Sequence, residues 1–286
     1  MKDDYELLDS GDGRKLERFG RYVLARPCSQ AMWRPKLSAA DWERADASFD
    51  REDGNRWHGR SNLPKEWQIE TAGVRFRLGG TDFGHLGIFP EQRAQWRWLR
   101  EHVGSAIASD GGRPLSVLNL FAYSGGSTMA AALGGAEVCH LDASKGMVEW
   151  ARENARLNGL AERPIRWIVD DAHKFMRREI RRGRAYDAII LDPPTFGRGA
   201  GGEMYKIERD LKDTLSLVRD LLSDRPSFVL FSSHTPGLSQ IVAENILSQL
   251  FPKAALESGE MLLEPRSAAS GPFACPSGIY CRAVWR

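Results

Sequence analysis

The sequence has few of the residues from which metal sites and disulfide frameworks are built. Its 286 residues include four cysteines, none in a CxxC pair, and six histidines. We therefore expect no metal site and no disulfide framework. The chain also lacks an apolar run long enough to cross a bilayer, and it begins with the acidic, polar segment MKDDYELLDSGDGRK rather than a signal peptide. These absences predict a cytoplasmic protein that binds no membrane.

The sequence also lacks a strong excess of charge of either sign. Its formal net charge is +2, so the chain as a whole is no polycation. Arginines are nevertheless clustered at Arg177, Arg178, Arg181, Arg182 and Arg184. Such a run is typical either of a solvated helix end, where cations complement the helix dipole, or of a surface that contacts phosphates. The sequence does not orient the run, so both interpretations stay open.

Residues from about 115 to 251 alternate between short β-rich runs and helical patterns. The β-rich runs are LSVLNLFA, AEVCHLDA, IRWIVDD, YDAIILD and SFVLFSS. Near-continuous apolar runs of this kind suit strands that are buried on both faces of a parallel sheet. The alternation therefore predicts βαβ units, which give an α/β fold with a doubly wound, mostly parallel sheet. Two later runs, ALESGEMLLE and GIYCRAVWR, have no helix between them, so they can pair antiparallel.

The N-terminal part of the chain follows a different pattern. The segments RYVLARP, WQIETAG and VRFRLGG have the composition of strands, and residues 39–49 have helical spacing. We predict a small α+β domain over residues 1–82. A larger domain then occupies residues 83–286 and opens with a helix over about residues 91–102.

Glycines and acidic residues follow the first two predicted strands of the larger domain. In a doubly wound sheet, ligands bind at the carboxyl ends of the strands. After the first strand, Gly125 and Gly126 let the backbone approach a ligand, but their spacing is not GxGxxG, which disfavours a pyrophosphate cradle. After the second strand, Asp142 can accept hydrogen bonds from both hydroxyls of a ribose, while Ser144 has the position of a helix cap.

The third predicted strand ends in VDDAHKF. There Asp171 can accept a hydrogen bond from an adenine amino group, and Ala172 leaves room for the ring. The alternative role for Asp171 is an ordinary helix N-cap.

The fourth predicted strand ends in LDPPTF, the most specific motif in the chain. Asp192 stands at the carboxyl edge, and Pro193 and Pro194 fix the backbone after it. Phe196 then supplies an aromatic face. A rigid polar group beside an aromatic face suits a base that is unpaired or flipped out of a helix.

Together these segments resemble the class I S-adenosylmethionine-dependent methyltransferases that modify bases of large-subunit ribosomal RNA, at cytosine C5 or guanine N7. The resemblance covers at least residues 83–240 and rests on VLNLFAYSGGST, LDASKGMVEWARENARLNG, DDAHKF and LDPPTF. It implies a Rossmann-like sheet of seven strands with the last one antiparallel. It also implies S-adenosyl-L-methionine as the cofactor and RNA as the partner.

The resemblance further implies which residues form the site. The expected contacts with the methionine part of the cofactor are Asn119, Phe121, Ser124 and Gly125. The expected ribose and adenine contacts are Asp142, Ser144, Asp171 and Ala172. The segment GHLGIFPEQRAQW resembles the stretch that folds over the methionine end in this family, so Gln92 and Arg93 would close the pocket. Asp192 would form the rim nearest the methyl group. The expected catalytic residues are Asp192, Pro193, Pro194 and Phe196.

The residue after the fifth predicted strand helps to indicate which atom accepts the methyl group. Methylation of cytosine C5 needs a thiolate that adds to C6, and relatives that perform it place a cysteine after the fifth strand. Here Ser233 stands where that cysteine would align, and none of the four cysteines falls at a predicted carboxyl edge. Guanine N7 has an exposed lone pair and needs no covalent catalyst. Since the DPPTF form also resembles relatives that act on guanine N7, we predict this atom as the acceptor.

Other interpretations stay open beside this prediction. An exocyclic amine is the next candidate acceptor, although Thr195 interrupts the pattern usual for amino methyltransferases. A protein or small-molecule acceptor is compatible with the same cofactor site. A nicotinamide-dependent oxidoreductase shares the architecture but is disfavoured by the missing GxGxxG and by DPPTF. RNA docking would fall to residues 1–82, with candidate phosphate contacts at Arg18, Arg21, Arg34, Arg56 and Arg60.

Overall fold

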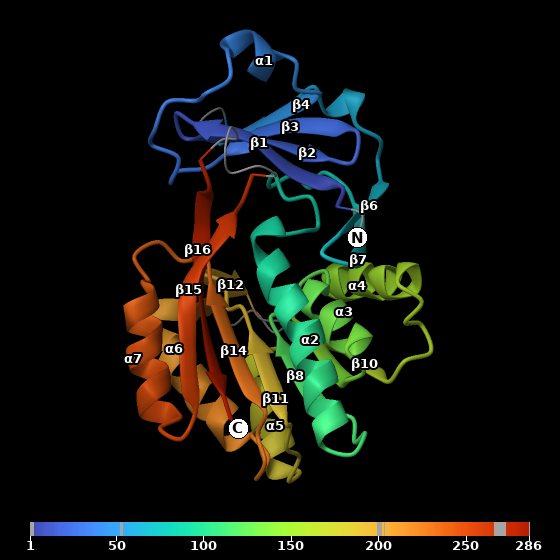
Figure 1. The fold of residues 1–286 in the computed structure, drawn as a ribbon, viewed down its shortest axis with the longest axis vertical. Coiled ribbons are helices and arrows are strands. Elements are labelled where there is room, and N and C mark those ends of the chain that lie inside the picture. The colour runs from blue at the N-terminus through green and yellow to red at the C-terminus, as the bar shows by residue number, and fades with distance from the viewer. Residues whose placement is uncertain (1–2, 52–53, 199–201, 203, 266–272, 286) are drawn as a thin grey trace. The chain divides into compact units, whose positions relative to one another are not determined.

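The computed structural model describes residues 3–51, 54–198, 202, 204–265 and 273–285 (Figure 1). The chain forms two compact units. The first comprises Met1–Ala94 and Leu262–Ser277, and the second comprises Gln95–Met261 and Gly278–Arg286. The predicted division into domains at residues 1–82 and 83–286 stays a prediction. Among the described residues, no helix is both long and apolar enough to cross a membrane.

The first unit contains a five-stranded sheet in which the strands follow chain order. All neighbouring strands are antiparallel except β3 and β4, which are parallel. The strands are β1 (Tyr5–Gly11), β2 (Arg14–Phe19), β3 (Tyr22–Pro27), β4 (Ala47–Asp50) and β5 (Arg56–His58). A separate hairpin is formed by β6 (Trp67–Thr71) and β7 (Val74–Leu78), and the short helices are α1 (Ala39–Glu43), η1 (Arg60–Asn62) and η2 (Pro90–Gln92).

The helix that was predicted over residues 39–49 is shorter in the structure. It ends at Glu43. The last three residues of the predicted helix, 47–49, belong instead to β4, which continues to Asp50. Ala47 and Phe49 are buried while Ser48 and Asp50 are half-buried, so burial alternates with the period of a strand. The prediction was wrong for this part because a short alternating run was read as the end of a helical pattern.

A buried carboxylate organises the core of the first unit. Glu17 lies on β2 and is fully buried. Its oxygens accept hydrogen bonds from the Arg26 guanidinium, at 2.8 Å from Nε, and from the Tyr5 hydroxyl at 2.9 Å. Lys15 Nζ lies 3.3 Å from the same carboxylate. A buried charge is tolerated only when it is paired in this way, so Glu17 fixes the relative positions of the first three strands.

Two free thiols from distant parts of the chain meet in the first unit. Cys28 follows β3 and Cys275 begins β16 (Cys275–Val284), and their Sγ atoms lie 2.9 Å apart. The hydrogen bond with Cys275, aided by the charge of Lys15, outweighs burial and lowers the pKa of Cys28 to about 7. Burial raises the pKa of Cys139 to about 11 and that of Cys281 to about 12. We therefore expect Cys28 to be more reactive than Cys139 and Cys281.

The second unit is built on a seven-stranded sheet, and this confirms the predicted α/β fold. The strand order is β10-β9-β8-β11-β14-β16-β15 (Figure 1). The first five of these are parallel, and β16 is antiparallel to β14. Their bounds are β8 (Ser116–Leu120), β9 (Glu137–Asp142), β10 (Ile165–Val169), β11 (Ala188–Leu191), β14 (Phe228–Ser233) and β15 (Ala255–Leu263). A small hairpin of β12 (Phe196–Arg198) and β13 (Met204–Lys206) follows β11.

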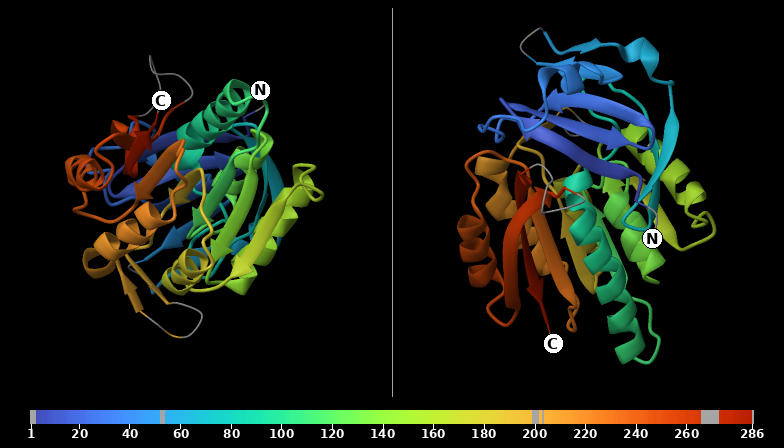
Figure 2. Two further views of the ribbon diagram at one scale, coloured as in Figure 1. Left: turned by 90° about the horizontal axis from the view of Figure 1, so that it is seen from below. Right: turned by 45° about the horizontal axis from the view of Figure 1, so that its top comes forward.

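Helices cover both faces of this sheet (Figure 2). The helices are α2 (Arg93–Ser109), α3 (Gly126–Leu133), α4 (Lys145–Leu157), α5 (Ala172–Arg181), α6 (Ile207–Asp220) and α7 (Gln240–Leu250). Alternate residues of the strands, such as Leu118 and Leu120, join apolar side chains of α5, α6 and α7 in one buried cluster. The other residues, such as Val117, face α2, α3 and α4. This two-sided burial explains why the strands are almost wholly apolar.

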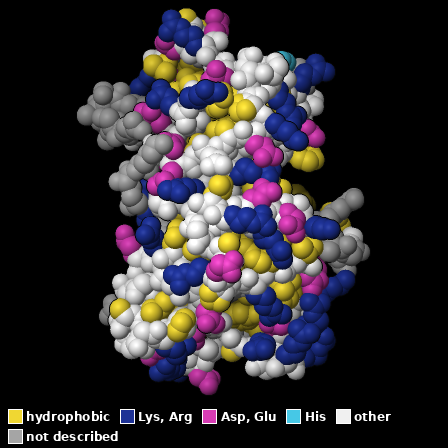
Figure 3. All heavy atoms as spheres, turned by 90° about the vertical axis from the view of Figure 1, so that its right-hand side faces the viewer, with side chains coloured by type: hydrophobic (Ala, Val, Ile, Leu, Met, Phe, Trp, Pro, Cys, Tyr) yellow, Lys and Arg dark blue, Asp and Glu magenta, His cyan; other side chains and the backbone are white. Residues whose placement is uncertain are grey.

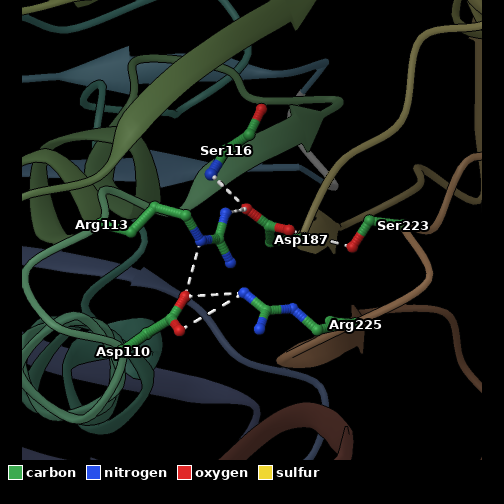
Figure 4. Close-up of polar contacts among 6 residues, drawn as sticks. All are labelled: Asp110, Arg113, Ser116, Asp187, Ser223 and Arg225. Carbon is green, nitrogen blue, oxygen red and sulfur yellow. Dashed lines mark hydrogen bonds and ion pairs between the residues drawn. The ribbon is translucent and has the colours of Figure 1, made fainter.

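A cluster of polar contacts joins the amino ends of the parallel strands (Figure 4). Its members are Asp110, Arg113, Ser116, Asp187, Ser223 and Arg225. Asp187, just before β11, accepts hydrogen bonds from Arg113 Nη1 at 2.8 Å, Ser116 N at 3.0 Å and Ser223 Oγ at 2.9 Å. Burial alone would raise the pKa of Asp187, but these donors outweigh it and lower that pKa. Asp187 therefore ties β8, β11 and the segment before β14 together.

We expect the Asp187→Asn variant to lose about 2 kcal/mol in the free energy of unfolding at pH 7, because a charged acceptor of three hydrogen bonds is removed. A carboxyl whose pKa is lowered by folding stabilises the protein above its unfolded pKa of about 3.9, and this stabilisation is lost as pH falls through the folded pKa. The difference between wild type and variant should therefore shrink in acid. Urea unfolding between pH 3 and pH 7 measures it.

The matched control is Asp220→Asn, since Asp220 pairs with Arg219 on the exposed end of α6. That change should alter the free energy of unfolding by less than about 0.5 kcal/mol. Equal effects of the two substitutions would contradict the role assigned to Asp187.

We expect iodoacetamide to modify Cys28 first in the folded protein, because at pH 7 about half of this side chain is thiolate. The rate should rise about tenfold per pH unit in acid and level off above pH 7. In the Cys275→Ala variant the donor is missing, so the midpoint should move to higher pH. Mass spectrometry of pulse-labelled peptides gives the rates. Similar modification rates at all four cysteines of the folded protein would contradict the lowered pKa of Cys28.

Candidate functional site

The parallel strands bring the predicted site residues to one edge of the second unit's sheet. The loops after β8, β9, β10 and β11 all leave the sheet at its carboxyl edge. These loops carry Phe121, Ser124, Gly125, Asp142, Ser144, Asp171, Ala172, Asp192, Pro193, Pro194 and Phe196. The edge is where a doubly wound sheet binds its ligand.

The loop after β8 has an uncommon backbone conformation. Phe121 has a φ of 55° and Tyr123 a φ of 50°, and Gly125 follows with 87°. Residues other than glycine seldom adopt positive φ, and each costs about 1–3 kcal/mol. A Cβ on Gly126 would lie 2.6 Å from the Trp96 ring, so no larger residue fits there. Strain of this kind persists where the surroundings enforce it, as at ligand sites.

Side-chain hydrogen bonds enforce this loop conformation from two neighbouring elements. Tyr123 N donates to Asp142 Oδ2 at the end of β9, with 2.9 Å between the atoms. Asn154 on α4 donates from Nδ2 to the carbonyl oxygen of Ser124, also at 2.9 Å. The loop therefore has a fixed shape before any ligand arrives.

A buried polar chain supports the loop from below. Asn119 Nδ2 donates to Thr128 Oγ1 at 2.9 Å, and Thr128 Oγ1 lies 2.9 Å from His140 Nδ1. Burial lowers the pKa of His140 to about 3, so its ring is neutral at physiological pH. Asn119 is itself buried, and this contact places its amide against α3. Its predicted contact with the methionine part of a cofactor stays a prediction.

Asp142 has the geometry of a ribose acceptor. Its Oδ1 accepts the Ser144 N–H at 2.8 Å, while Oδ2 accepts the Tyr123 N–H at 2.9 Å. Each carboxylate oxygen has a second lone pair, so two hydroxyls can still donate to this group. Burial raises the pKa of Asp142, and the two backbone donors only partly oppose that rise. Further donors would favour its charged form.

Ser144 and Asp171 both act as helix caps. Ser144 Oγ accepts the Met147 N–H at the start of α4, as the sequence predicted. Asp171 Oδ1 accepts the Lys174 N–H at 2.9 Å at the start of α5, and Ala172 is buried as the first residue of that helix. The cap role of Asp171 is thus present in the structure. A contact between its carboxylate and an adenine stays a prediction.

The DPPTF loop meets the end of β14. Asp192 Oδ1 lies 3.5 Å from His234 Nδ1, and Thr195 Oγ1 lies 2.9 Å from Thr235 Oγ1. Phe196 begins β12 with 60% of its surface exposed, an unusual exposure for a large aromatic side chain. His234 and Thr235 were not predicted as site residues. The available signal was their position in FSSHTPG, directly after the fifth strand.

The second unit has no thiol at this edge among its described residues. Ser233, the last residue of β14, is buried and its Oγ accepts the Thr235 N–H at 3.2 Å. Cys139 lies in the middle of β9, and Cys281 lies opposite Phe231 in the sheet. Both are buried. Their pKa values are raised, so neither is suited to nucleophilic attack.

Gln92 and Arg93 are nearly buried in the first unit. Arg93 Nη1 lies 3.2 Å from Asp3 Oδ2, its Nε donates to the Pro90 carbonyl at 3.2 Å, and its guanidinium lies 4.6 Å from the centre of the Tyr5 ring. These contacts give Arg93 a fixed position within its own unit. The expectation that the two residues close a cofactor pocket stays a prediction.

Comparison with known proteins decides the family. A family model described as S-adenosylmethionine-dependent methyltransferase matches residues 44–231. The chain belongs to this family. The predicted cofactor, S-adenosylmethionine, is thereby confirmed. The carboxyl edge also fits it, since a half-buried carboxylate and a rigid strand–helix loop suit a ribose and its attached chain.

Individual relatives agree with this assignment. The crystal structure of a methyltransferase from Agrobacterium tumefaciens has a TM-score of 0.92 with this methyltransferase and is 37% identical; the match covers 100% of this chain and 91% of that one. Ribosomal RNA large subunit methyltransferase I of Aeromonas hydrophila is 34% identical over 254 residues, which is 85% of this chain but 60% of that protein. The protein of the same name from Escherichia coli is 29% identical over 306 residues, with 98% and 73% covered.

We expect the Asp142→Asn variant to bind S-adenosylhomocysteine about ten- to a hundredfold more weakly, because a charged acceptor of two hydroxyl hydrogen bonds is lost. Wild-type affinity should fall in mild acid, since burial raises the pKa of Asp142 and its protonated form accepts less well. The affinity of the variant should show no such fall. Calorimetric titrations from pH 5 to pH 8 measure both effects.

The control for this experiment is Asp224→Asn, which changes an exposed carboxylate before β14. It should bind the ligand as wild type does. An Asp142→Asn variant that folds and binds with unchanged affinity would remove Asp142 from the site.

Proposed function

We propose that this protein transfers a methyl group from S-adenosylmethionine to a base of ribosomal RNA, and that the acceptor atom is guanine N7. The observation that carries the proposal is the DPPTF loop. It holds a carboxylate, Asp192, and an exposed aromatic ring, Phe196, at the carboxyl edge of the sheet. An exposed ring beside a fixed polar group suits the stacking of an unpaired base.

The chain's own residues supply positioning and charge. Bound S-adenosylmethionine would supply an electrophilic methyl group on a sulfonium. Asp142 would hold its ribose, and the rigid loop after β8 would fix its methionine chain. Phe196 would stack on the base, which aligns the N7 lone pair for in-line attack. Methylation at N7 leaves a positive charge on the purine, and the Asp192 carboxylate at the rim would stabilise that charge as it develops.

Cytosine C5 is the less suitable acceptor for this site. Its methylation needs a nucleophile that adds to C6, and the residue at the end of β14 is Ser233. A buried hydroxyl that already accepts the Thr235 N–H is a poor substitute for a thiolate. Guanine N7 needs no such group.

The names of the relatives support ribosomal RNA as the substrate class. Residues 1–82 would then form the docking domain. Of the candidate phosphate contacts there, Arg18 pairs with Glu6 and Arg60 with Asp82, while Arg34 is exposed. Arg21 and Arg56 are exposed as well, so Arg21, Arg34 and Arg56 are the stronger of these candidates.

A second acceptor is favoured by one contact. An exocyclic amine loses a proton when it is methylated, and His234 lies 3.5 Å from Asp192 at the rim. An imidazole oriented by a carboxylate is a common proton acceptor. N7 methylation gives that imidazole no proton to remove, so the two acceptors make different demands on His234.

We expect protein-free total RNA, incubated with the enzyme and methyl-labelled S-adenosylmethionine, to yield labelled 7-methylguanosine after digestion. The His234→Ala variant should keep kcat within a few-fold, because no proton is abstracted. Loss of about a hundredfold or more in kcat, with label in an N-methylated exocyclic amine, would replace N7 by the second acceptor. Label in 5-methylcytidine would overturn the argument from Ser233.

The Asp192→Asn variant is the matched test of the charge argument. It should keep affinity for S-adenosylhomocysteine and lose kcat. Label in protein or in a small molecule, with none in naked RNA or ribosomal particles, would refute RNA as the substrate.

A further inference from the structure

The amino edge of the second unit's sheet carries a basic groove. It has a volume of about 670 Å³ and lies at the amino ends of β8, β9 and β10. Four arginines line it: Arg163, Arg166, Arg182 and Arg184. The first two come from the turn into β10 and from that strand, whereas the others follow α5. Two of them belong to the arginine run that the sequence left unassigned. The groove is at the opposite edge from the DPPTF loop, so the methyl-transfer site does not account for it.

Two of the four arginines are held in place by a buried carboxylate. Glu179 is 1% exposed, and its oxygens lie 3.0 Å from Arg166 Nη1 and 3.1 Å from Arg182 Nη1. The Tyr186 hydroxyl donates to Glu179 as well, at 2.8 Å. Burial would raise the pKa of Glu179, but these donors outweigh it and lower that pKa. A guanidinium has five N–H donors, so a single bond to Glu179 leaves others for a ligand.

The other two arginines have no carboxylate of their own. Arg163 and Arg184 are both exposed, and neither forms an ion pair with any residue that the structure describes. Apart from Glu179, the acidic residue lining the groove is Glu137. Positive charge therefore exceeds negative charge in the groove. Figure 3 shows Lys and Arg side chains gathered over the lower part of the face that carries β10.

The groove connects with the cofactor edge along β10. This strand is the terminal one in the sheet order, and Arg166 and Val169 on it are exposed. Its amino end opens on the groove, and its carboxyl end leads to Asp171 at the cofactor edge. Five residues of strand span about 17 Å. A single-stranded segment of several nucleotides covers that length and can contact both edges.

We propose that this groove binds backbone phosphates of the RNA substrate, at a second site remote from methyl transfer. The proposal rests on the proposed function. Guanidinium groups bind phosphate oxygens in a bidentate manner, and four of them, from two segments of the chain, surround a hollow. A phosphodiester chain fits into a hollow of this kind better than the flat surface of a partner protein does. The groove would read no sequence but would fix how the RNA lies on the sheet.

The test is the double variant Arg163→Gln/Arg184→Gln, which leaves the Glu179 network intact. Its affinity for a labelled ribosomal RNA fragment should be at least about tenfold weaker at 50 mM salt than that of the wild type. The slope of log affinity against log salt should fall by about 1.4, since each phosphate contact contributes about 0.7 for a single strand. KM for RNA should rise, while kcat at saturating RNA and the Kd of S-adenosylhomocysteine stay within twofold.

Two further variants separate charge from other effects. Arg163→Lys/Arg184→Lys keeps the charge, so it should restore most of the slope. Arg97→Gln/Arg100→Gln removes two exposed charges from α2 that do not line the groove, and it should leave the slope unchanged. An equal loss of slope in both Gln variants would mean a general charge effect and would overturn the proposal.

The outcomes also separate this proposal from the proposed function. If all variants methylate RNA with the wild-type KM and slope, the groove has no part in RNA binding and only this inference fails. If the substitutions leave naked RNA unaffected but weaken binding to assembled ribosomal particles, the groove contacts protein and the inference fails again. If the wild type neither binds nor methylates RNA, the proposed function fails and the groove proposal fails with it.

Discussion

The hydrogen bond from Tyr123 N to Asp142 holds the part of the fold on which the cofactor site depends. The loop after β8 contains two residues other than glycine at positive φ, and such residues together cost a few kcal/mol. A charged acceptor for a backbone N–H contributes about 1.5–3 kcal/mol, which offsets much of that strain. Without Asp142 the loop would relax toward ordinary backbone angles. The conformation of the loop and the predicted ribose contact of Asp142 therefore depend on the same carboxylate.

Burial and hydrogen bonding have opposite effects on the charged form of Asp142. Burial raises the pKa of Asp142, so its charge is costly in the absence of a ligand. Hydroxyl donors from a ribose would lower that cost. With the predicted ribose contact, part of the binding free energy would come from stabilising the charged form of Asp142. Asp187, at the other edge of the sheet, already accepts three hydrogen bonds. Its charged form needs no ligand for stabilisation, so this carboxylate contributes to the stability of the fold alone.

The sequence predicted the parts of the fold that are governed by a strong periodic signal. The central strands of the parallel sheet are buried on both faces, so their apolar runs are unambiguous; Asp142 ends β9 and Asp192 directly follows β11. The first unit gave a weaker signal. Its strands are short and half polar; β2 even buries Glu17, which no apolar pattern reveals. Phe49, which belongs to β4, was assigned to a helix for the same reason.

Other features depend on contacts that sequence distance conceals. Cys28 and Cys275 are far apart in the chain, and nothing in their spacing indicates that they meet. His234 follows a strand that was predicted, but its proximity to Asp192 depends on β14 lying next to β11 in the sheet. Strand order, unlike strand identity, is set by packing and crossover topology. Contacts between neighbouring strand ends could therefore be proposed only once that order was known.

The distribution of charge along the sheet is the last consequence of this architecture. The carboxyl edge gathers Asp142, Asp171 and Asp192, whereas the amino edge gathers the arginines of the basic groove. The sulfonium of S-adenosylmethionine is a cation and a nucleic acid backbone is a polyanion, so the two edges attract opposite ligands. A net charge of only +2 conceals this separation. Under the proposed RNA function, a strand bound at the amino edge would run along β10 toward the carboxyl edge, where Asp192 follows β11. The phosphate groups nearest the carboxylates would be repelled from that edge, and this repulsion favours insertion of a base, rather than of backbone, into the site.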